Sequence, residues 1–299
     1  MGLTGLRSVE LGVTDVPASE RFYTEVWGLA PVGSDHDAVY LRGTGAAHHV
    51  VALRRRPNPE LLSITFSARS REDVDGLHAA VTRADAGPVE APAAISEPGG
   101  GYGFAFKDRE GRIFRAIAGD ARHADARPSP GRPHELAHVV LNSADVPRAT
   151  AFFVDVLGFR LTDQTRMMDF VTCNDHHHNI AFAHADAATL NHIAFELPDL
   201  ESVMRGAGRL RDAGFRIEWG VGRHGPGNNV FAYFVGPEDF VVEYTAEVNR
   251  IDASYRVGRP DDWRWPPGRV DHWGISDPPS ERMKAAQKKI RFAEAIARG

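Results

Sequence analysis

The segment LAHVVLNSADVPRATAFFVDVLGFRLT, residues 136–162, decides the fold because the chain contains it twice. The other copy is LRSVELGVTDVPASERFYTEVWGLAPV, residues 6–32. Each copy predicts a strand, an Asp-Val-Pro turn, an amphipathic helix, and a glycine before another strand. The turn aspartates Asp15 and Asp145 are 130 residues apart (145 − 15).

The similarity continues along the chain at an offset near 130 residues. LLSITF at 61–66 matches LNHIAF at 190–195, the helical pattern at 71–87 matches that at 199–214, and 104–116 matches 232–244. The chain is therefore predicted to be a tandem duplication of an α+β unit with βαβββ order, in which a curved sheet encloses a cavity. The predicted boundaries are an N-terminal domain at 1–122, a Pro/Arg-rich linker at 123–133, a C-terminal domain at 134–250, and a tail at 251–299.

Composition excludes several classes of protein. The 299 residues are 42% hydrophobic and 25% charged, with a formal net charge of −5, which argues against binding to nucleic acid or to a membrane surface. The run Arg54-Arg55-Arg56 is expected to be a solvated loop. The single cysteine, Cys173, allows no internal disulfide and fits a reducing compartment. With no signal-peptide pattern and no membrane-length apolar run, we expect a cytoplasmic protein.

The two repeats differ at three positions that lie in predicted strands. The first repeat has Ser, Ser and Arg where the second has His, His and Glu; the pairs are Ser8 with His138, Ser63 with His192, and Arg115 with Glu243. Taken singly, each polar residue would be ordinary. Together, two histidines and one carboxylate form the set that suits non-haem Fe(II), and the same set can bind catalytic zinc.

With these residues placed, the chain resembles the vicinal-oxygen-chelate superfamily and, within it, the two-domain type I extradiol catechol dioxygenases, in particular catechol and homoprotocatechuate 2,3-dioxygenases. The resemblance covers nearly the whole chain. It implies that His138, His192 and Glu243 bind the metal in the C-terminal domain and that the N-terminal domain has lost its site. It implies Fe(II), with Mn(II) equally suited to the ligands.

Two further motifs carry the resemblance. In CNDHHHNIAF, residues 173–182, the family's acid–base histidine falls on His178. If 176–182 is a strand, His176 shares the cavity face with His178, and His177 points outside. In GRHGPGNNVFAYFVGPEDFVVEY, residues 222–244, His224 and Tyr233 stand nine residues apart, and Glu243 follows after ten more.

The resemblance implies a reaction as well. His178 would donate and accept protons, whereas His224 and Tyr233 would bind the substrate oxygens, with Tyr233 a candidate for deprotonation. Catechol and O2 would give a 2-hydroxymuconic semialdehyde-type product. Two alternatives stay open: a glyoxalase-like isomerase of the same superfamily, and a non-enzymatic small-molecule binder.

The tail is the least informative segment. The resemblance suggests that it folds over the mouth of the site, and Arg269 is the candidate to bind a substrate carboxylate; the alternative is an arginine that packs on Trp273. The last stretch, from an N-cap at Ser280, is expected to form an exposed basic helix. The family habit predicts a homo-oligomer.

Overall fold

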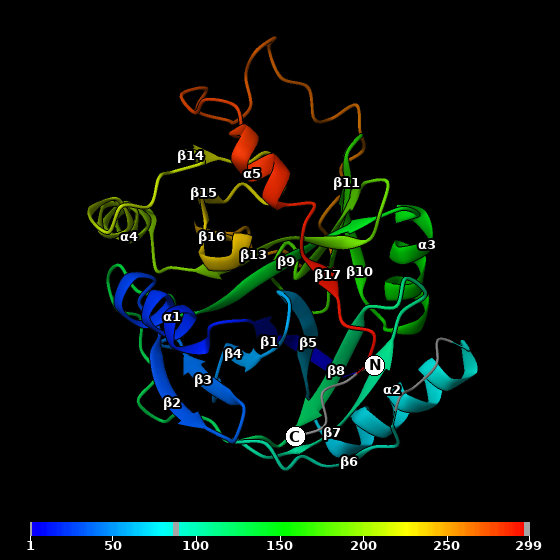
Figure 1. The fold of residues 1–299 in the computed structure, drawn as a ribbon. Coiled ribbons are helices and arrows are strands. Elements are labelled where there is room, and N and C mark those ends of the chain that lie inside the picture. Colours follow the sequence, from blue (N-terminus) through cyan, green and yellow to red (C-terminus); the bar gives the residue numbers. More distant parts are fainter. Residues whose placement is uncertain (1, 86–89, 296–299) are drawn as a thin grey trace.

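The computed structural model describes residues 2–85 and 90–295, which form two β-sheets of the same topology (Figure 1). The strands of the first repeat are β1 (Leu3–Val13), β2 (Ala30–Ser34), β3 (Ala38–Arg42), β4 (Val51–Arg55), β5 (Glu60–Ala68), β6 (Ala93–Ala94), β7 (Tyr102–Lys107) and β8 (Ile113–Ala118). Those of the second are β9 (Glu135–Ser143), β10 (Arg160–Gln164), β11 (Met168–Thr172), β12 (Ile180–His184), β13 (Thr189–Glu196), β14 (Trp219–Arg223), β15 (Val230–Val235) and β16 (Val241–Ala246).

Apart from η3 and α5, the helices occupy matching places in the two repeats. They are α1 (Val16–Arg21) continuing into η1 (Phe22–Val26), α2 (Arg71–Arg83), α3 (Val146–Ala151) continuing into η2 (Phe152–Val156), α4 (Leu200–Asp212), the short turn η3 (Pro237–Asp239), and α5 (Glu281–Ala286). The pattern at 71–87 predicted a longer helix than α2, and its last two residues lie outside the described part of the chain.

Each repeat contains two βαβββ modules rather than one. The sheet orders are β2-β3-β4-β1-β5-β8-β7-β6 and β10-β11-β12-β9-β13-β16-β15-β14. In both sheets the first strands of the two modules pair antiparallel at the centre, and each pairs parallel with the last strand of its own module. The predicted α+β architecture with tandem βαβββ units is therefore confirmed.

Helix caps explain why the repeated Asp-Val-Pro sequence starts a helix. The side chain of Asp15 accepts a hydrogen bond from the backbone N–H of Ala18 at 2.9 Å, and Asp145 does the same for Arg148 at 3.1 Å. The proline that follows fits the first helical turn, where its missing N–H leaves no hydrogen bond unmade.

Aromatic side chains from each repeat pack into the core of the other. Trp27, which follows η1, stacks on Tyr244 of β16 with ring centroids 3.8 Å apart, and its ring also meets Phe195 of β13. In the opposite direction, Phe153 of η2 lies 5.2 Å from Phe114 of β8. Because these rings are buried, the two repeats share one hydrophobic core.

The C-terminal tail joins the two sheets, and the expected exposed helix is shorter than predicted and buries one side. Ser280 caps α5 as expected, but Met283 and Ala286 are buried against β15 and β16. The chain then leaves the helix and forms β17 (Arg291–Phe292), which pairs parallel with β5 of the first repeat. Residues 296–299, where the predicted helix would end, lie outside the described residues.

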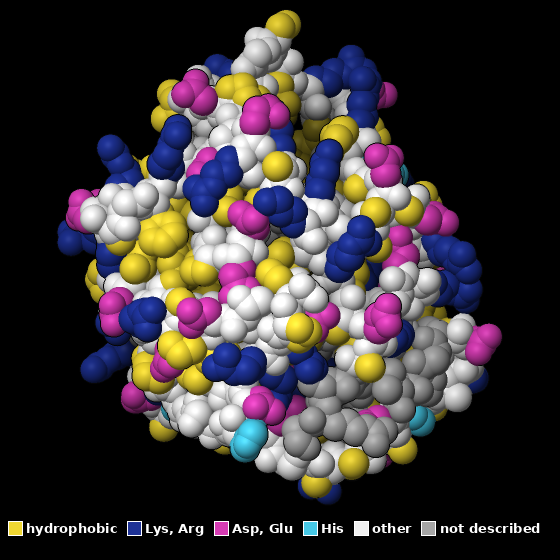
Figure 2. All heavy atoms as spheres, in the orientation of Figure 1, with side chains coloured by type: hydrophobic (Ala, Val, Ile, Leu, Met, Phe, Trp, Pro, Cys, Tyr) yellow, Lys and Arg dark blue, Asp and Glu magenta, His cyan; other side chains and the backbone are white. Residues whose placement is uncertain are grey.

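The expectation of a solvated Arg54 was wrong. Arg54 lies in β4, is 4% exposed, and donates a hydrogen bond to Glu10 of β1 at 2.6 Å. On the outer surface, positively and negatively charged side chains are interspersed over the face drawn in Figure 2. No helix of the described residues is long and apolar enough to cross a membrane.

Candidate metal centre

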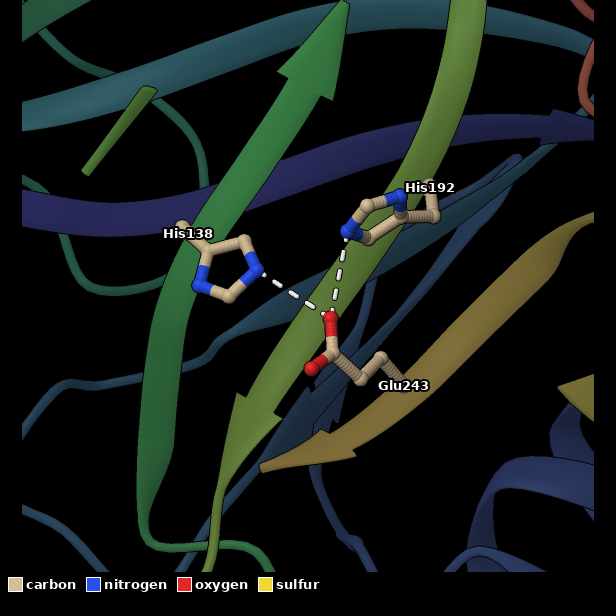
Figure 3. A group of neighbouring side chains, drawn as sticks. All are labelled: His138, His192 and Glu243. Atoms are coloured by element: carbon tan, nitrogen blue, oxygen red, sulfur yellow. Dashed lines mark hydrogen bonds and ion pairs between the residues drawn. The ribbon is translucent and has the colours of Figure 1, made fainter. Parts of the chain in front are cut away.

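Three adjacent strands bring His138, His192 and Glu243 together on one face of the second sheet (Figure 3). They lie on β9, β13 and β16, and each is at most 5% exposed. The Nε2 atoms of both histidines are 3.1 Å from Oε2 of Glu243. One potential ligand atom from each residue lies within 4.8 Å of the other two, which is compatible with a shared metal ion.

The two histidines favour the ionised form of Glu243. Burial alone would raise the pKa of this carboxyl, but His138 and His192 outweigh that effect and hold the pKa well below its usual range. The cluster therefore presents one fixed negative charge beside two imidazoles.

The hydrogen bonds of His192 indicate which kind of group the cluster can bind. Asn191 donates its amide N–H to Asn142 at 2.9 Å, so its oxygen faces His192 Nδ1 at 2.8 Å. Nδ1 of His192 must then carry a proton, so a neutral ring turns the lone pair of Nε2 toward the carboxylate oxygen of Glu243, and Nε2 has no hydrogen-bond partner among the described residues. Two acceptors that face each other in a buried site repel unless a proton or a metal ion lies between them, and a divalent metal bound by Nε2 and the carboxylate fits these residues.

The other expected residues surround this cluster. The ring of His178 lies 4.2 Å from that of His138, between centroids. Tyr233 stands directly across from Glu243 in the pairing of β15 with β16, and its hydroxyl is 2.9 Å from His224 Nε2. Burial lowers the pKa of His224 to about 4, lowers that of His178 strongly, and raises that of Tyr233 well above its usual range. In all three groups, burial therefore favours the uncharged form.

A family model described as Glyoxalase/Bleomycin resistance protein/Dioxygenase superfamily matches residues 5–114 and 135–244. The chain belongs to this superfamily. Its two matched segments coincide with the two repeats, and all three residues of the candidate metal cluster fall within the second.

Three similar proteins show which enzymes of the superfamily resemble this chain. The crystal structure of a Mn(II)-bound glyoxalase from Novosphingobium aromaticivorans is 39% identical, covers 94% of both chains, and superposes with a TM-score of 0.87. A biphenyl-2,3-diol 1,2-dioxygenase from Paraburkholderia xenovorans is 25% identical over 95% of this chain and 100% of its own. Metapyrocatechase 2 from Cupriavidus necator is 35% identical over 40% of this chain and 39% of its own.

In the first repeat, the positions that correspond to the three candidate metal ligands are occupied by Ser8, Ser63 and Arg115. Arg115, the counterpart of Glu243, forms an ion pair with Glu97 at 2.8 Å. Ser63 bonds to Glu10, and Ser8 accepts a hydrogen bond from Arg7. Fixed guanidinium groups thus supply the positive charge inside the first sheet, where the second sheet presents metal ligands.

The expected arrangement of the three consecutive histidines was wrong. β12 starts at Ile180, so the run lies in the loop before it rather than in a strand. His176 does not line the cavity, but lies between Glu135 at 3.8 Å and Glu196 at 3.6 Å. His177 points inward, with Nδ1 2.9 Å from His178 Nδ1.

Among the described residues, no contact places Arg269 at the metal cluster or beside His178, His224 or Tyr233. It is exposed, in a turn closed by its backbone N–H to Pro266, and its guanidinium lies against Gly274. Trp273, suggested as its alternative partner, is covered instead by Arg223 at 5.0 Å. Binding of substrate by Arg269 stays a prediction.

Sequence reasoning missed several residues that support the site. Asn191 sets the tautomer of His192, and Trp219 stacks on Tyr233 with ring centroids 5.0 Å apart. Asp163 accepts a hydrogen bond from His177 at 2.7 Å. Only Asn191, a polar residue directly before a predicted ligand in a strand, offered a signal in the sequence.

Proposed function

We propose that this protein is an Fe(II)-dependent extradiol dioxygenase, which opens the ring of a catechol beside its two hydroxyl groups with O2. The observation that carries the proposal is the set of three proton carriers, the buried His178 and Tyr233 and the partly exposed His224, around the two-histidine, one-carboxylate cluster. The relatives named as dioxygenases of biphenyl-2,3-diol and as metapyrocatechase support the same reaction.

His138, His192 and Glu243 would hold the metal. Fe(II) bound there would bring catecholate and O2 together and let electrons pass from the ring to oxygen. With neutral imidazoles, the three residues leave a divalent ion with one formal positive charge. A substrate bound as a monoanion makes the buried site neutral, which favours catechols over neutral or dianionic ligands.

The proton transfers fall to this chain's own residues. Tyr233 and His224 share a hydrogen bond of 2.9 Å, so the pair can accept a hydroxyl proton from a catechol that lies against Tyr233. His178 lies beside His138, whereas Tyr233 packs on His192 with ring centroids 5.0 Å apart. His178 can hold a proton and return it when the ring opens to a semialdehyde-type product.

A metal-dependent isomerase is the second candidate, because the Novosphingobium aromaticivorans protein, 39% identical, is called a Mn(II)-bound glyoxalase. The ligand set of this chain suits Mn(II) as well as Fe(II). The His224–Tyr233 pair favours the dioxygenase, since a catechol supplies a hydroxyl proton that such a pair can take up.

Oxygen uptake decides between these functions. The protein is reconstituted anaerobically with Fe(II) or Mn(II) and given catechol, methylcatechols, homoprotocatechuate and 2,3-dihydroxybiphenyl. One O2 consumed per catechol, with a yellow product, is expected. No uptake by protein that holds one metal per chain, with turnover of a methylglyoxal–glutathione hemithioacetal, would establish the isomerase instead.

Two wider properties belong to the same proposal. We expect a homo-oligomer, to be measured by light scattering on the eluting protein, and a cytoplasmic location, to be measured by cell fractionation. The substrate class is a small aromatic diol.

A further inference from the structure

A buried chain of hydrogen bonds leads from the C-terminal tail to His178. Asp163, at the end of β10, is 0% exposed, and its Oδ2 accepts a hydrogen bond from His177 Nε2 at 2.7 Å. His177, also 0% exposed, places Nδ1 2.9 Å from Nδ1 of His178. None of these three side chains can exchange its partner for water without moving.

Two groups of the tail complete the surroundings of Asp163. The backbone N–H of Gly258 donates to Oδ1 at 2.7 Å, and the hydroxyl of Tyr255 donates to Oδ2 at 3.1 Å. Gly227 covers the two imidazoles from the other side: a Cβ built on it would lie 3.2 Å from atoms of both His177 and His178. The contact is close enough that a larger residue would displace the rings.

The proton positions follow from the chemistry of the partners. Asp163 already accepts hydrogen bonds from Gly258 and Tyr255, and as the acceptor of the third bond it requires His177 to carry a proton on Nε2. A His177 ring with its one proton on Nε2 accepts at Nδ1, so the proton of the 2.9 Å contact belongs to Nδ1 of His178. This leaves Nε2 of His178 with a lone pair directed away from His177.

We propose that Asp163 and His177 are positioning residues that fix the tautomer of His178, so that its Nε2 is ready to accept a proton. Tyr255 and Gly258 couple this arrangement to the position of the C-terminal tail. The role in catalysis rests on the proposed ring cleavage, because there His178 carries the proton. The arrangement itself does not depend on that reaction.

Replacing Asp163 by asparagine should reverse the donor and acceptor roles along these hydrogen bonds without moving the side chains. The N–H of Gly258 requires an acceptor at the Oδ1 position, so the asparagine oxygen stays there and its NH2 group faces His177. Nε2 of His177 must then accept, its Nδ1 carries the proton, and the proton of His178 moves to Nε2. Asp163→Asn therefore gives His178 the wrong tautomer in an otherwise intact site.

The first measurement is the tautomer of each ring, by proton–nitrogen NMR of the full chain with 15N-labelled histidine. Zn(II), a diamagnetic ion suited to such ligands, fills the metal site. His177→Gln and His178→Gln variants assign the two signals. In the wild-type protein we expect His177 protonated at Nε2 and His178 at Nδ1, and in Asp163→Asn the reverse. A wild-type His178 protonated at Nε2, or rings unchanged in Asp163→Asn, would overturn the inference without any need for the variant to be active.

The second measurement is turnover. With Fe(II) content matched, Asp163→Asn should lower kcat by about 10² to 10⁴, the range for loss of a general acid or base, with a small change in KM. Asp169→Asn is the matched control, because Asp169 is a buried aspartate of β11 that accepts from Thr150 and Gln164 instead. Inverted tautomers with unchanged kcat would refute the positioning role. A wild-type protein that consumes no O2 with any catechol would refute the proposed function, while the NMR result still decides the hydrogen-bond arrangement.

Discussion

Two glycines of α4 provide a matched test of how this helix is held against the strand that carries Glu243. Gly206 is buried under Tyr244, and a Cβ built on it would lie 2.6 Å from the tyrosine ring. Gly208, two residues later, is exposed, and an added Cβ would meet nothing within 4 Å. Tyr244 is the neighbour of Glu243 in β16, so pressure on its ring reaches the metal cluster.

The expected difference follows from two terms. Glycine to alanine in a helix interior stabilises by about 0.8–1 kcal/mol, and both variants gain this amount. Overpacking costs about 1–3 kcal/mol and applies only to Gly206→Ala. Gly208→Ala should therefore raise the free energy of unfolding by about 1 kcal/mol. The free energy of unfolding of Gly206→Ala should be about 1–3 kcal/mol lower than that of Gly208→Ala.

Thermal unfolding at a fixed metal concentration measures this difference. At about 2 °C per kcal/mol for a chain of this length, the two melting temperatures should differ by about 2–6 °C. Gly206→Ala should also release metal more readily to a chelator. Equal melting temperatures in the two variants would refute the close packing of α4 on Tyr244.

Three other outcomes test the metal cluster and its surroundings. Glu243→Gln removes the only fixed negative charge of the cluster, so metal affinity should fall by at least about 100-fold, measured as metal content after dialysis; retention of a full equivalent would contradict the ligand assignment. Asn191→Ala should weaken metal binding by about 10- to 100-fold because the tautomer of His192 is no longer fixed, whereas Asn191→Asp, which keeps the acceptor, should retain the metal; equal losses in titrations of both variants would count against this role. Burial lowers the pKa of His224 to about 4 from an ordinary 6.5, so in metal-free protein the stability it contributes is complete above about pH 6.5 and is lost as the pH falls to about 4. With 20% of this side chain exposed, the loss should be about 1–3 kcal/mol, and the acid limb of denaturant unfolding should be flatter in His224→Gln; an identical limb would show that His224 does not titrate this way.

The repeat made the fold and the centre of the site predictable. Internal similarity placed the strands and helices in two equivalent units, and the positions where the units differ identified His138, His192 and Glu243. This worked because core residues are constrained alike in both copies, so a polar exchange at a core position stands out. Regular strand alternation then oriented the three side chains correctly.

The rest depended on contacts that no repeat or periodicity encodes. The loop before β12 was treated as a strand, and alternation therefore assigned His176 and His177 to the wrong sides. Arg54 looked like a surface residue because its partner, Glu10, is 44 positions away. The tail has no second copy in the chain, so its strand pairing with β5 left no pattern to recognise.

The mutual exchange of aromatic side chains between the repeats also has a consequence for synthesis on the ribosome. Trp27 reaches its partner Tyr244 only after 217 more residues have been translated, which takes about 10–40 s at about 5–20 residues per second. During that interval the nascent first repeat lacks three of the aromatic partners of Trp27, namely Phe195, Phe234 and Tyr244. We therefore expect the N-terminal half, expressed alone, to bind chaperones or to aggregate, and the order of synthesis makes the metal cluster one of the last parts of the molecule to form.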